Sequence, residues 1–484
     1  MKALEVHKVP MRIGDAYVES AGEHIDVTDP SSGDVLARVP RSTAGEIDRA
    51  VRAARDAYAG WSAVPVVERA HRFFSFAILL EKHKEELARL VATENGKALP
   101  DARAEVRRGI ELVEFACGMP SLMMGDSLEG IAQGIDSQTI RQPLGVCIGI
   151  TPFNFPAMVP LWMYPIAIAA GNTFVLKPSP LTPLSALRIA ELFYECDFPP
   201  GALNVVHGDK DAVEALISHA DVRAVSFVGS SNVARHVQAL AVEHHKRVQA
   251  LGGAKNHLIV MPDGVSEATR DAIMSSAFGG AGERCLAGSV VVAVGEAGDA
   301  LVAMLRDACR GLSLGAALDE RAGMGPVISV QAKARIEGYI EEGVRSGFEV
   351  VCDGREAATP DPDGTYLGPT LFDRVDPTSK IVREEIFGPV LSVIRAPDLE
   401  SAVRIANASP YGNAASIFTQ SGRAARTFAS KVEAGMVGVN IGVAAPMAFF
   451  PFGGVKDSLF GDLRIHGKDG VAFYTQQKVT ITRW

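Results

Sequence analysis

Cys285 stands in a segment whose composition suits a reactive thiol. It closes the run FGGAGERC, in which glycines leave room for a small molecule and Glu283 and Arg284 directly precede the sulfur. A neighbouring cation or a helix terminus favours the thiolate, which is the nucleophile, whereas an apolar setting keeps a thiol inert. Cys117 and Cys147 are interpreted as such inert core residues. Covalent catalysis at Cys285 is therefore a hypothesis, with a structural thiol as its alternative.

Two further polar residues follow apolar runs typical of buried strands. Asn154 lies in TPFNFP, where flanking prolines would hold its amide rigidly as a hydrogen-bond donor. Lys177 ends the run TFVLK before Pro178, so a stiff turn would present its ammonium to an anion or a ribose. A turn-forming asparagine and an exposed surface lysine remain the alternatives.

The segment FVGSSNVA (227–234) predicts a strand, a turn at Gly229 and a helix. This order would aim backbone N–H groups and the positive end of a helix dipole at a phosphate, as in a dinucleotide pyrophosphate. The same order is common in simple turns, and G-x-G-x-x-G is absent. Phosphate binding is again one of two interpretations.

The elements that would position these residues alternate between strands and helices. Residues 43–118 show the three-and-four apolar spacing of amphipathic helices, with Thr43 as a candidate N-cap. Strands are predicted after Gly145 at 146–150, 173–176, 204–206, 224–228 and 248–251. This alternation indicates a parallel, doubly wound sheet, whose ligands bind beyond the carboxyl ends of the strands.

A second α/β pattern begins near residue 257, with a helix expected at 267–281, a strand at 288–294 and a helix at 330–346. Two segments fit neither pattern, the polar strand-like stretch 127–143 and the alternating tail 471–484. We expect both to be exposed strands that pair in an oligomer.

Composition excludes several classes of protein. A length of 484 residues implies more than one core, and 47% hydrophobic and 22% charged residues are typical of a globular protein. A net charge of -9 without a basic cluster argues against nucleic acid or an anionic membrane as partner. No membrane span, signal core, C-x-x-C pair or metal-ligand spacing is evident, so we expect a cytoplasmic protein without metal that acts on small molecules.

Taken together, the motifs follow one family in order and spacing. TPFNFP, FVLKPS, FVGSSNVA, LGG, GERC, EEIFGPV and PFGG resemble the aldehyde dehydrogenase superfamily across almost the whole chain. The resemblance implies an α/β fold with a Rossmann-type parallel-sheet cofactor domain (1–126 and 144–252) and an α/β catalytic domain (253–462). It also implies a small β flap for oligomerisation (127–143 and 463–484), in a homotetramer or dimer.

The resemblance also assigns roles to single residues. It makes Cys285 the nucleophile and Asn154 an oxyanion donor beside the Cys285 backbone N–H. Glu385 would bind the nicotinamide ribose and Lys177 the adenosine ribose, while Phe387 would pack beside the nicotinamide. The residues expected to contact NAD are Thr151, Phe153, Lys177, Ser179, Gly229, Ser230, Leu251, Glu385 and Phe387.

The departures from the family pattern concern product release. Most members place a glutamate before L-G-G, where this chain has Ala250. Water has a pKa near 16 and needs such a base, whereas a thiol with a pKa of about 8.5 supplies its own nucleophile, which favours coenzyme A as acceptor. With AKNH, GERC, SLFGDLRIHGKDG and FYTQQK, the chain resembles the methylmalonate-semialdehyde dehydrogenase branch. That branch converts methylmalonate or malonate semialdehyde to propanoyl-CoA or acetyl-CoA with loss of carbon dioxide.

The substrates of this branch carry a carboxylate, which a guanidinium can pair with in bidentate fashion. Arg108 and Arg284 are the candidates, and surface charge is the alternative for Arg108 and for its neighbour Arg107. A dehydrogenase that hydrolyses its thioester to a free acid remains the rival function. NADP also remains open, because Ala234 replaces a phosphate-loop glycine and Pro180 stands where many NAD-preferring members have a glutamate.

Overall fold

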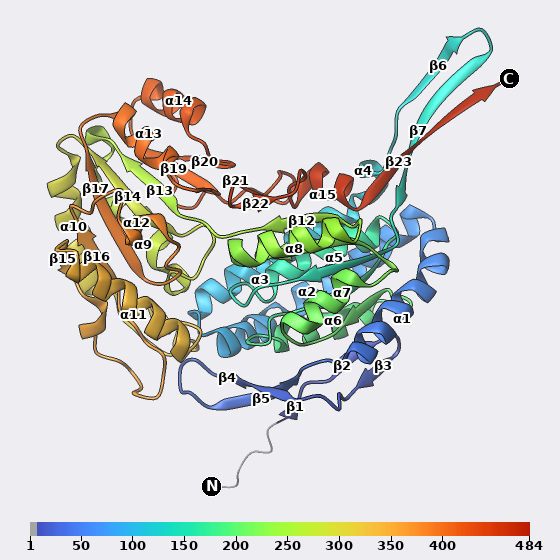
Figure 1. Ribbon diagram of the computed structural model, residues 1–484, viewed down its shortest axis with the longest axis horizontal. Helices are drawn as coiled ribbons and strands as arrows, with labels where there is room; N and C mark the ends of the chain where they lie inside the picture. Colours follow the sequence, from blue (N-terminus) through green and yellow to red (C-terminus); the bar gives the residue numbers. More distant parts are fainter. Residues whose placement is uncertain (1–6) are drawn as a thin grey trace.

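The computed structural model describes residues 7–484 and shows two sheets lying side by side, each covered by helices (Figure 1). The described residues also form three smaller sheets, one of which projects from one end of the molecule and carries the C-terminus near its tip. Residues 1–6 of the predicted cofactor domain lie outside the described residues. No helix within residues 7–484 is long and apolar enough to cross a membrane.

The first sheet has a parallel centre and antiparallel edges. Its strands, in spatial order, are β22 (Leu459–Phe460), β12 (Arg247–Leu251), β11 (Val222–Val228), β8 (Val146–Ile150), β9 (Thr173–Lys177), β10 (Leu203–Val205), β2 (Met11–Ile13) and β3 (Ala16–Val18). The register pairs Ile150 with both Lys177 and Phe227, which aligns the carboxyl ends of the central strands. The predicted strands and their parallel arrangement are confirmed to within a residue or two.

Helices cover both faces of this sheet. The helices on one face are α1 (Ala44–Ala63), α7 (Lys210–Ser218) and α8 (Ser231–Glu243), and those on the other are α2 (Val66–Asn95), α3 (Leu99–Cys117), α5 (Met158–Ala169) and α6 (Leu184–Tyr194). Thr43 caps α1 as predicted, because its hydroxyl accepts from the Glu46 N–H while the Glu46 carboxylate accepts from the Thr43 N–H. Helix α5 is apolar on all sides because it is buried on all sides. This burial accounts for the hydrophobic run in the sequence, which is too short to span a bilayer.

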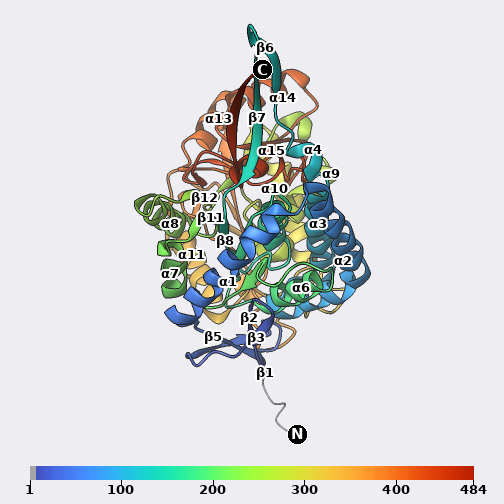
Figure 2. The ribbon, with the colours of Figure 1, turned by 90° about the vertical axis from the view of Figure 1, so that its right-hand side faces the viewer.

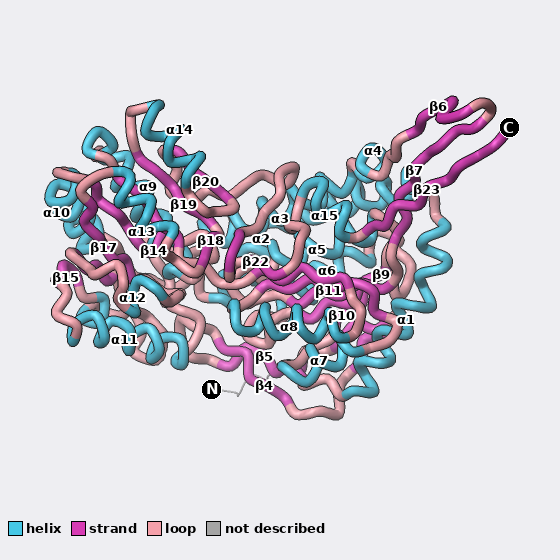
Figure 3. The backbone as a smooth tube through the Cα atoms, turned by 45° about the horizontal axis from the view of Figure 1, so that its top comes forward, coloured by secondary structure: helices cyan, strands magenta, loops and turns pink. Residues whose placement is uncertain are grey.

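The second sheet is parallel except for its first strand. Its order is β15 (Glu349–Cys352), β16 (Thr370–Asp373), β17 (Val390–Ala396), β14 (Gly288–Val294), β13 (Asn256–Val260), β19 (Ala414–Phe418) and β20 (Met436–Val439). The helices associated with it are α9 (Glu267–Phe278), α10 (Ala297–Gly311), α11 (Val330–Arg345), α12 (Lys380–Arg383), α13 (Leu399–Asn407) and α14 (Gly422–Lys431). Figure 3 shows its strands as a group separate from those of the first sheet. The predicted second α/β unit is thus present.

The two segments that fitted neither pattern form the projecting sheet with each other. β23 (Thr475–Arg483) pairs antiparallel with β7 (Ile135–Pro143), which pairs with β6 (Ser127–Ala132), so their pairing does not require another chain (Figure 2). The tail strand also begins later than expected, because residues 471–473 end helix α15 (Gly467–Phe473), which packs on α5. Likewise β22 lies inside the predicted catalytic segment but pairs with β12 of the first sheet.

Candidate active site

Two cavities meet at Cys285. The strand-end cavity lies at the carboxyl ends of β8, β9, β11 and β12, and the helix-side cavity lies between α3, α5 and the segment 443–466. Cys285, Phe155 and Trp162 line both cavities. The predicted residues in the wall of the strand-end cavity are Thr151, Phe153, Asn154, Lys177, Ser179, Gly229, Ser230, Glu385 and Phe387. The strand-end rule therefore brings most of the predicted site together.

A glycine-rich turn presents Cys285 to this junction. The helix predicted at 267–281 stops at Phe278, and Gly280, Ala281 and Gly282 then take positive φ angles of 57°, 53° and 71°. Left-handed backbone of this kind costs little at glycine and is incompatible with a continued right-handed helix. The FGGAGERC segment therefore leaves the helical conformation after α9 and forms a turn that leads to Cys285.

Side-chain amides fix the Cys285 peptide from two directions. Its carbonyl accepts from Asn256 Nδ2 and from Asn413 Nδ2, each at 2.9 Å. Burial raises the pKa of the thiol to about 12, and the Glu385 carboxylate adds to this shift. The backbone N–H groups of Cys285 and Leu286 act in the opposite direction because they stabilise negative charge on the sulfur. Such donors are suited to an anion that forms at this position.

Asn154 faces the turn that carries Cys285. Its Nδ2 donates to the Glu283 carbonyl at 2.9 Å, and the side chain is buried. Behind it, Lys97 donates to the Asn154 carbonyl and forms a fully buried ion pair with Glu105. Glu105 in turn accepts from the Ala157 N–H at 2.9 Å. The pair therefore clamps the TPFNFP segment against α3 and orients the amide.

Charged side chains in the strand-end cavity are held by backbone groups. The buried Lys177 ammonium donates to the carbonyls of Pro178 (2.9 Å) and Gly208 (3.1 Å), and burial lowers its pKa to about 8. The Glu385 carboxylate accepts from the Ala254 N–H at 2.8 Å, and burial raises its pKa to about 7. Both groups would gain from an added hydrogen-bonding partner in the cavity.

The remaining predicted residues surround these charges. Ser230 occupies the N-cap position of α8 without a side-chain cap hydrogen bond, and it lines the cavity, so the helix N-terminus opens onto the cavity. The rings of Phe153 and Phe387 meet edge to face at 5.8 Å. Leu251 lies behind the cavity wall, where its carbonyl accepts from the Gly229 N–H at 3.1 Å. The carboxyl end of β9 and the ends of the neighbouring strands thus form the floor of the strand-end cavity. The N-terminus of α8 lies beside this floor.

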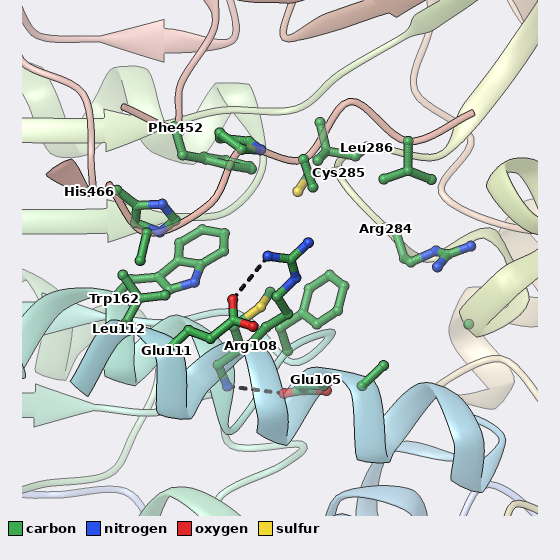
Figure 4. Close-up of a pocket in the computed structure, with 18 of the residues that line it drawn as sticks. Glu105, Arg108, Glu111, Leu112, Trp162, Arg284, Cys285, Leu286, Phe452 and His466 are labelled. Atoms are coloured by element: carbon green, nitrogen blue, oxygen red, sulfur yellow. Dashed lines mark hydrogen bonds and ion pairs between the residues drawn. The ribbon is translucent and has the colours of Figure 1, made fainter. Parts of the chain in front are cut away.

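The two candidate arginines differ in orientation, although both line the helix-side cavity. Arg108 extends from α3 into the cavity toward Cys285 and pairs with Glu111 at 2.9 Å (Figure 4). The Arg284 guanidinium points away from the cavity centre and donates to the Ser275 carbonyl. Only the first arrangement offers a guanidinium directly to a ligand beside the sulfur.

Comparisons with known proteins show to which family the chain belongs. The aldehyde dehydrogenase family model matches residues 17–480. The chain is 52% identical to malonate-semialdehyde dehydrogenase 1 of Geobacillus kaustophilus over 473 residues, which are 98% of this chain and 97% of that protein. The chain belongs to the aldehyde dehydrogenase family.

Solved aldehyde dehydrogenase structures superpose on the whole chain. One, described as a methylmalonate-semialdehyde dehydrogenase of Sinorhizobium meliloti complexed with NAD, has a TM-score of 0.98 at 42% identity and covers 99% of this chain and 98% of its own. A second, the methylmalonate-semialdehyde dehydrogenase of Oceanimonas doudoroffii, has a TM-score of 0.98 at 44% identity and covers 99% of both chains. The predicted family and fold are confirmed.

The site of this aldehyde dehydrogenase has the chemistry to hold a dinucleotide. Thr151 Oγ1 is buried in the strand-end cavity with no hydrogen-bond partner among the described residues, so a ligand hydroxyl or phosphate would satisfy it. The α8 N-terminus suits a pyrophosphate, and Lys177 and Glu385 suit ribose hydroxyls. Residues 7–484 contain no cluster of His, Cys, Asp or Glu able to hold a metal ion.

Several residues that hold Asn154 and Cys285 in position in this aldehyde dehydrogenase were not predicted from the sequence. These are Lys97, Glu105, Asn256 and Asn413. Asn256 lies in the quoted AKNH motif, but the sequence shows no signal that its amide faces Cys285. Arg335, which lines the strand-end cavity and donates to the Phe387 carbonyl at 3.4 Å, was missed as well.

Proposed function

We propose that this aldehyde dehydrogenase oxidises malonate semialdehyde and methylmalonate semialdehyde to acetyl-CoA and propanoyl-CoA, with loss of carbon dioxide and with NAD⁺ as oxidant. The observation that carries the proposal is a thiol, Cys285, at the junction of the strand-end cavity and a second cavity that contains the Arg108 guanidinium. The names of similar proteins from G. kaustophilus and O. doudoroffii support the same substrate class.

Oxidation begins with the Cys285 sulfur. The thiolate attacks the aldehyde carbon, and the resulting alkoxide accepts hydrogen bonds from Asn154 Nδ2 and the Cys285 backbone N–H. Bound NAD⁺ supplies the hydride acceptor, and NAD⁺ is favoured by the S. meliloti structure that contains NAD. Collapse of the alkoxide leaves an acyl thioester on Cys285. Arg108 holds the substrate carboxylate through these steps.

The loss of carbon dioxide itself needs no base at the reacting carbon. The thioester carbonyl lies β to the carboxylate, so the C–C bond can break with its electron pair moving to the thioester oxygen. Carbon dioxide leaves, and the two oxyanion donors stabilise the enolate. A proton from solvent then adds to the carbon, which gives the acetyl or propanoyl thioester.

Release by a thiol is favoured over release by water. Ala250, at the position of the usual hydrolytic base, is fully buried in β12 between Phe227 and Phe460. Among the described residues, the carboxylates that line either cavity are Asp101, Glu105, Glu111 and Glu385. The first three are engaged in a hydrogen bond or ion pair, and Glu385 would bind the nicotinamide ribose. The coenzyme A thiolate attacks the thioester carbon, and the Cys285 thiolate leaves.

Assembly and location follow from the projecting sheet and the thiols. Its exposed apolar side chains, Leu128, Ile131, Ile140, Val479, Ile481 and Trp484, suit burial against a second copy in a homotetramer or dimer. All six cysteines are free thiols, which fits a reducing cytoplasm.

The test is the dependence of turnover on the acceptor. With malonate semialdehyde and NAD⁺, steady NADH formation should require coenzyme A, and the product should be acetyl-CoA with an equal amount of carbon dioxide. Without coenzyme A, NADH should form in a burst of about one equivalent per active site. A steady rate and a free-acid product that ignore coenzyme A would instead establish the hydrolytic rival.

A further inference from the structure

His466 occupies a strained and tightly enclosed position in the wall of the helix-side cavity. Its φ angle of 76° and ψ angle of 167° lie in an extended, positive-φ region that is almost confined to glycine. The preceding residue, Ile465, is fixed by two backbone hydrogen bonds with Phe452, at 2.7 and 3.1 Å. The imidazole meets the Trp162 ring edge to face at 4.7 Å and the Phe452 ring at 5.5 Å. The backbone and two aromatic rings therefore hold the imidazole in one place.

The imidazole is nevertheless unsatisfied. His466 is 3% exposed, and neither Nδ1 nor Nε2 finds a hydrogen-bond partner in the part of the chain that the structure describes. The Trp162 indole N–H, in the same cavity wall, is also buried without a partner among residues 7–484. Buried polar groups are almost always paired, so two adjacent exceptions indicate a polar ligand that arrives from the cavity.

The charge beside these groups indicates what that ligand is. Arg108 faces the same cavity and lowers the pKa of His466, as burial does more strongly, so the ring is neutral and keeps one N–H donor. In Figure 4 the Arg108 guanidinium lies between His466 and Trp162 on one side and Arg284 on the other. A guanidinium with two neutral N–H donors nearby suits a single carboxylate, whose two oxygens together accept several hydrogen bonds.

We infer that His466, together with the Trp162 N–H, binds the carboxylate of the 3-oxo acid substrate and sets the preference of this enzyme for acidic over neutral aldehydes. The inference rests on the proposed function, in which Arg108 supplies the charge. In this subsite Arg108 attracts the substrate carboxylate, and the two neutral donors, His466 and the Trp162 N–H, orient it.

The experiment compares malonate semialdehyde with propanal, a three-carbon aldehyde that lacks the carboxylate. His466→Phe keeps an aromatic ring against Trp162 and removes both nitrogens. It should lower kcat/KM for malonate semialdehyde about tenfold, equivalent to about 1.4 kcal/mol, mainly through KM. The value for propanal should change by less than about twofold. His466→Asn restores an N–H donor, so it should recover part of the loss.

Equal losses for the two aldehydes, or no loss for either, would overturn the inference. Should the phenylalanine variant not fold, His466→Leu and His466→Asn form a second pair of similar size, in which only asparagine should retain the acid preference. Wild-type enzyme that does not prefer malonate semialdehyde to propanal would contradict the proposed function itself. A strong wild-type preference that His466→Phe leaves intact would contradict the role of His466 alone.

Discussion

The two cavities that meet at Cys285 are built in different ways. Strand ends and a helix N-terminus form the strand-end cavity, and backbone groups hold its charges, as at Lys177 and Glu385. Side chains from α3, α5 and a late loop form the helix-side cavity, and its charges pair with one another, as Arg108 does with Glu111. The strand-end cavity therefore depends mainly on the geometry of the backbone, whereas single substitutions can change the shape and charge of the helix-side cavity.

This difference predicts how variants of each region fail. Removing a charged side chain from the strand-end cavity leaves its backbone partners free to form hydrogen bonds with water or with the cofactor. Removing one member of a helix-side pair leaves a charge without its partner, which costs more when the pair is buried. Cys285 lines both cavities, so its loss should stop the reaction without changing the structure of either cavity.

The largest effect is expected for Cys285→Ala. Turnover should fall by about 10⁴-fold or more because no thioester can form, while the affinity for NADH, measured by fluorescence, should stay within about twofold. Cys147→Ala is the matched control, since that buried thiol lies in β8 away from both cavities. Comparable turnover in the Cys285 variant would remove the nucleophile assignment.

Asn154→Ala should come next. Loss of one oxyanion donor typically lowers kcat by about 10²–10³-fold, and the loss should fall on both acidic and neutral aldehydes because the alkoxide is common to them. Single-turnover measurement of NADH formation separates this step from acyl transfer. A change confined to KM would show that the amide binds substrate instead of stabilising the alkoxide.

Arg108→Leu should affect the two substrate classes differently. The loss of a charged hydrogen bond, worth about 1.5–3 kcal/mol, should lower kcat/KM for malonate semialdehyde about 100-fold and for propanal only slightly. Arg107→Leu is the control, because Arg107 is half-exposed on the same helix and pairs with surface carboxylates. Parallel losses for both aldehydes would make Arg108 a structural residue.

The sequence predicted the residues of the strand-end cavity better than those of the helix-side cavity, because the two cavities are built differently. Residues at strand ends, such as Lys177 and Gly229, were placed correctly because register and parallel pairing fix where they meet. The end of α9 was misjudged by a few residues, since apolar spacing continues into a turn whose positive φ angles only the folded loop shows.

Residues brought in by long-range packing could not be predicted. His466 reaches the helix-side cavity from the last helix region, and its role depends on Trp162, which is far away in sequence. The projecting strands were recognised by alternation, but alternation does not name a partner strand, and the partners proved to be in the same chain. Local patterns therefore predict elements better than the contacts between them.

The smallest effect concerns the electrostatic link across the junction, from Glu385 to Cys285. The pKa of the thiol is raised to about 12, partly by the Glu385 carboxylate, whose own pKa is raised to about 7. Alkylation of the cofactor-free enzyme by iodoacetamide should therefore accelerate as pH rises from 6 to 9, because only the thiolate reacts.

Glu385→Gln should react at the wild-type rate near pH 5.5, where the wild-type carboxylate is protonated and neutral. Above pH 7 the wild-type carboxylate is charged and disfavours the thiolate, so the variant should become about threefold faster, measured by mass spectrometry of the labelled Cys285. A ratio that stays constant from pH 5.5 to 8.5 would mean that Glu385 does not act on the sulfur through its charge.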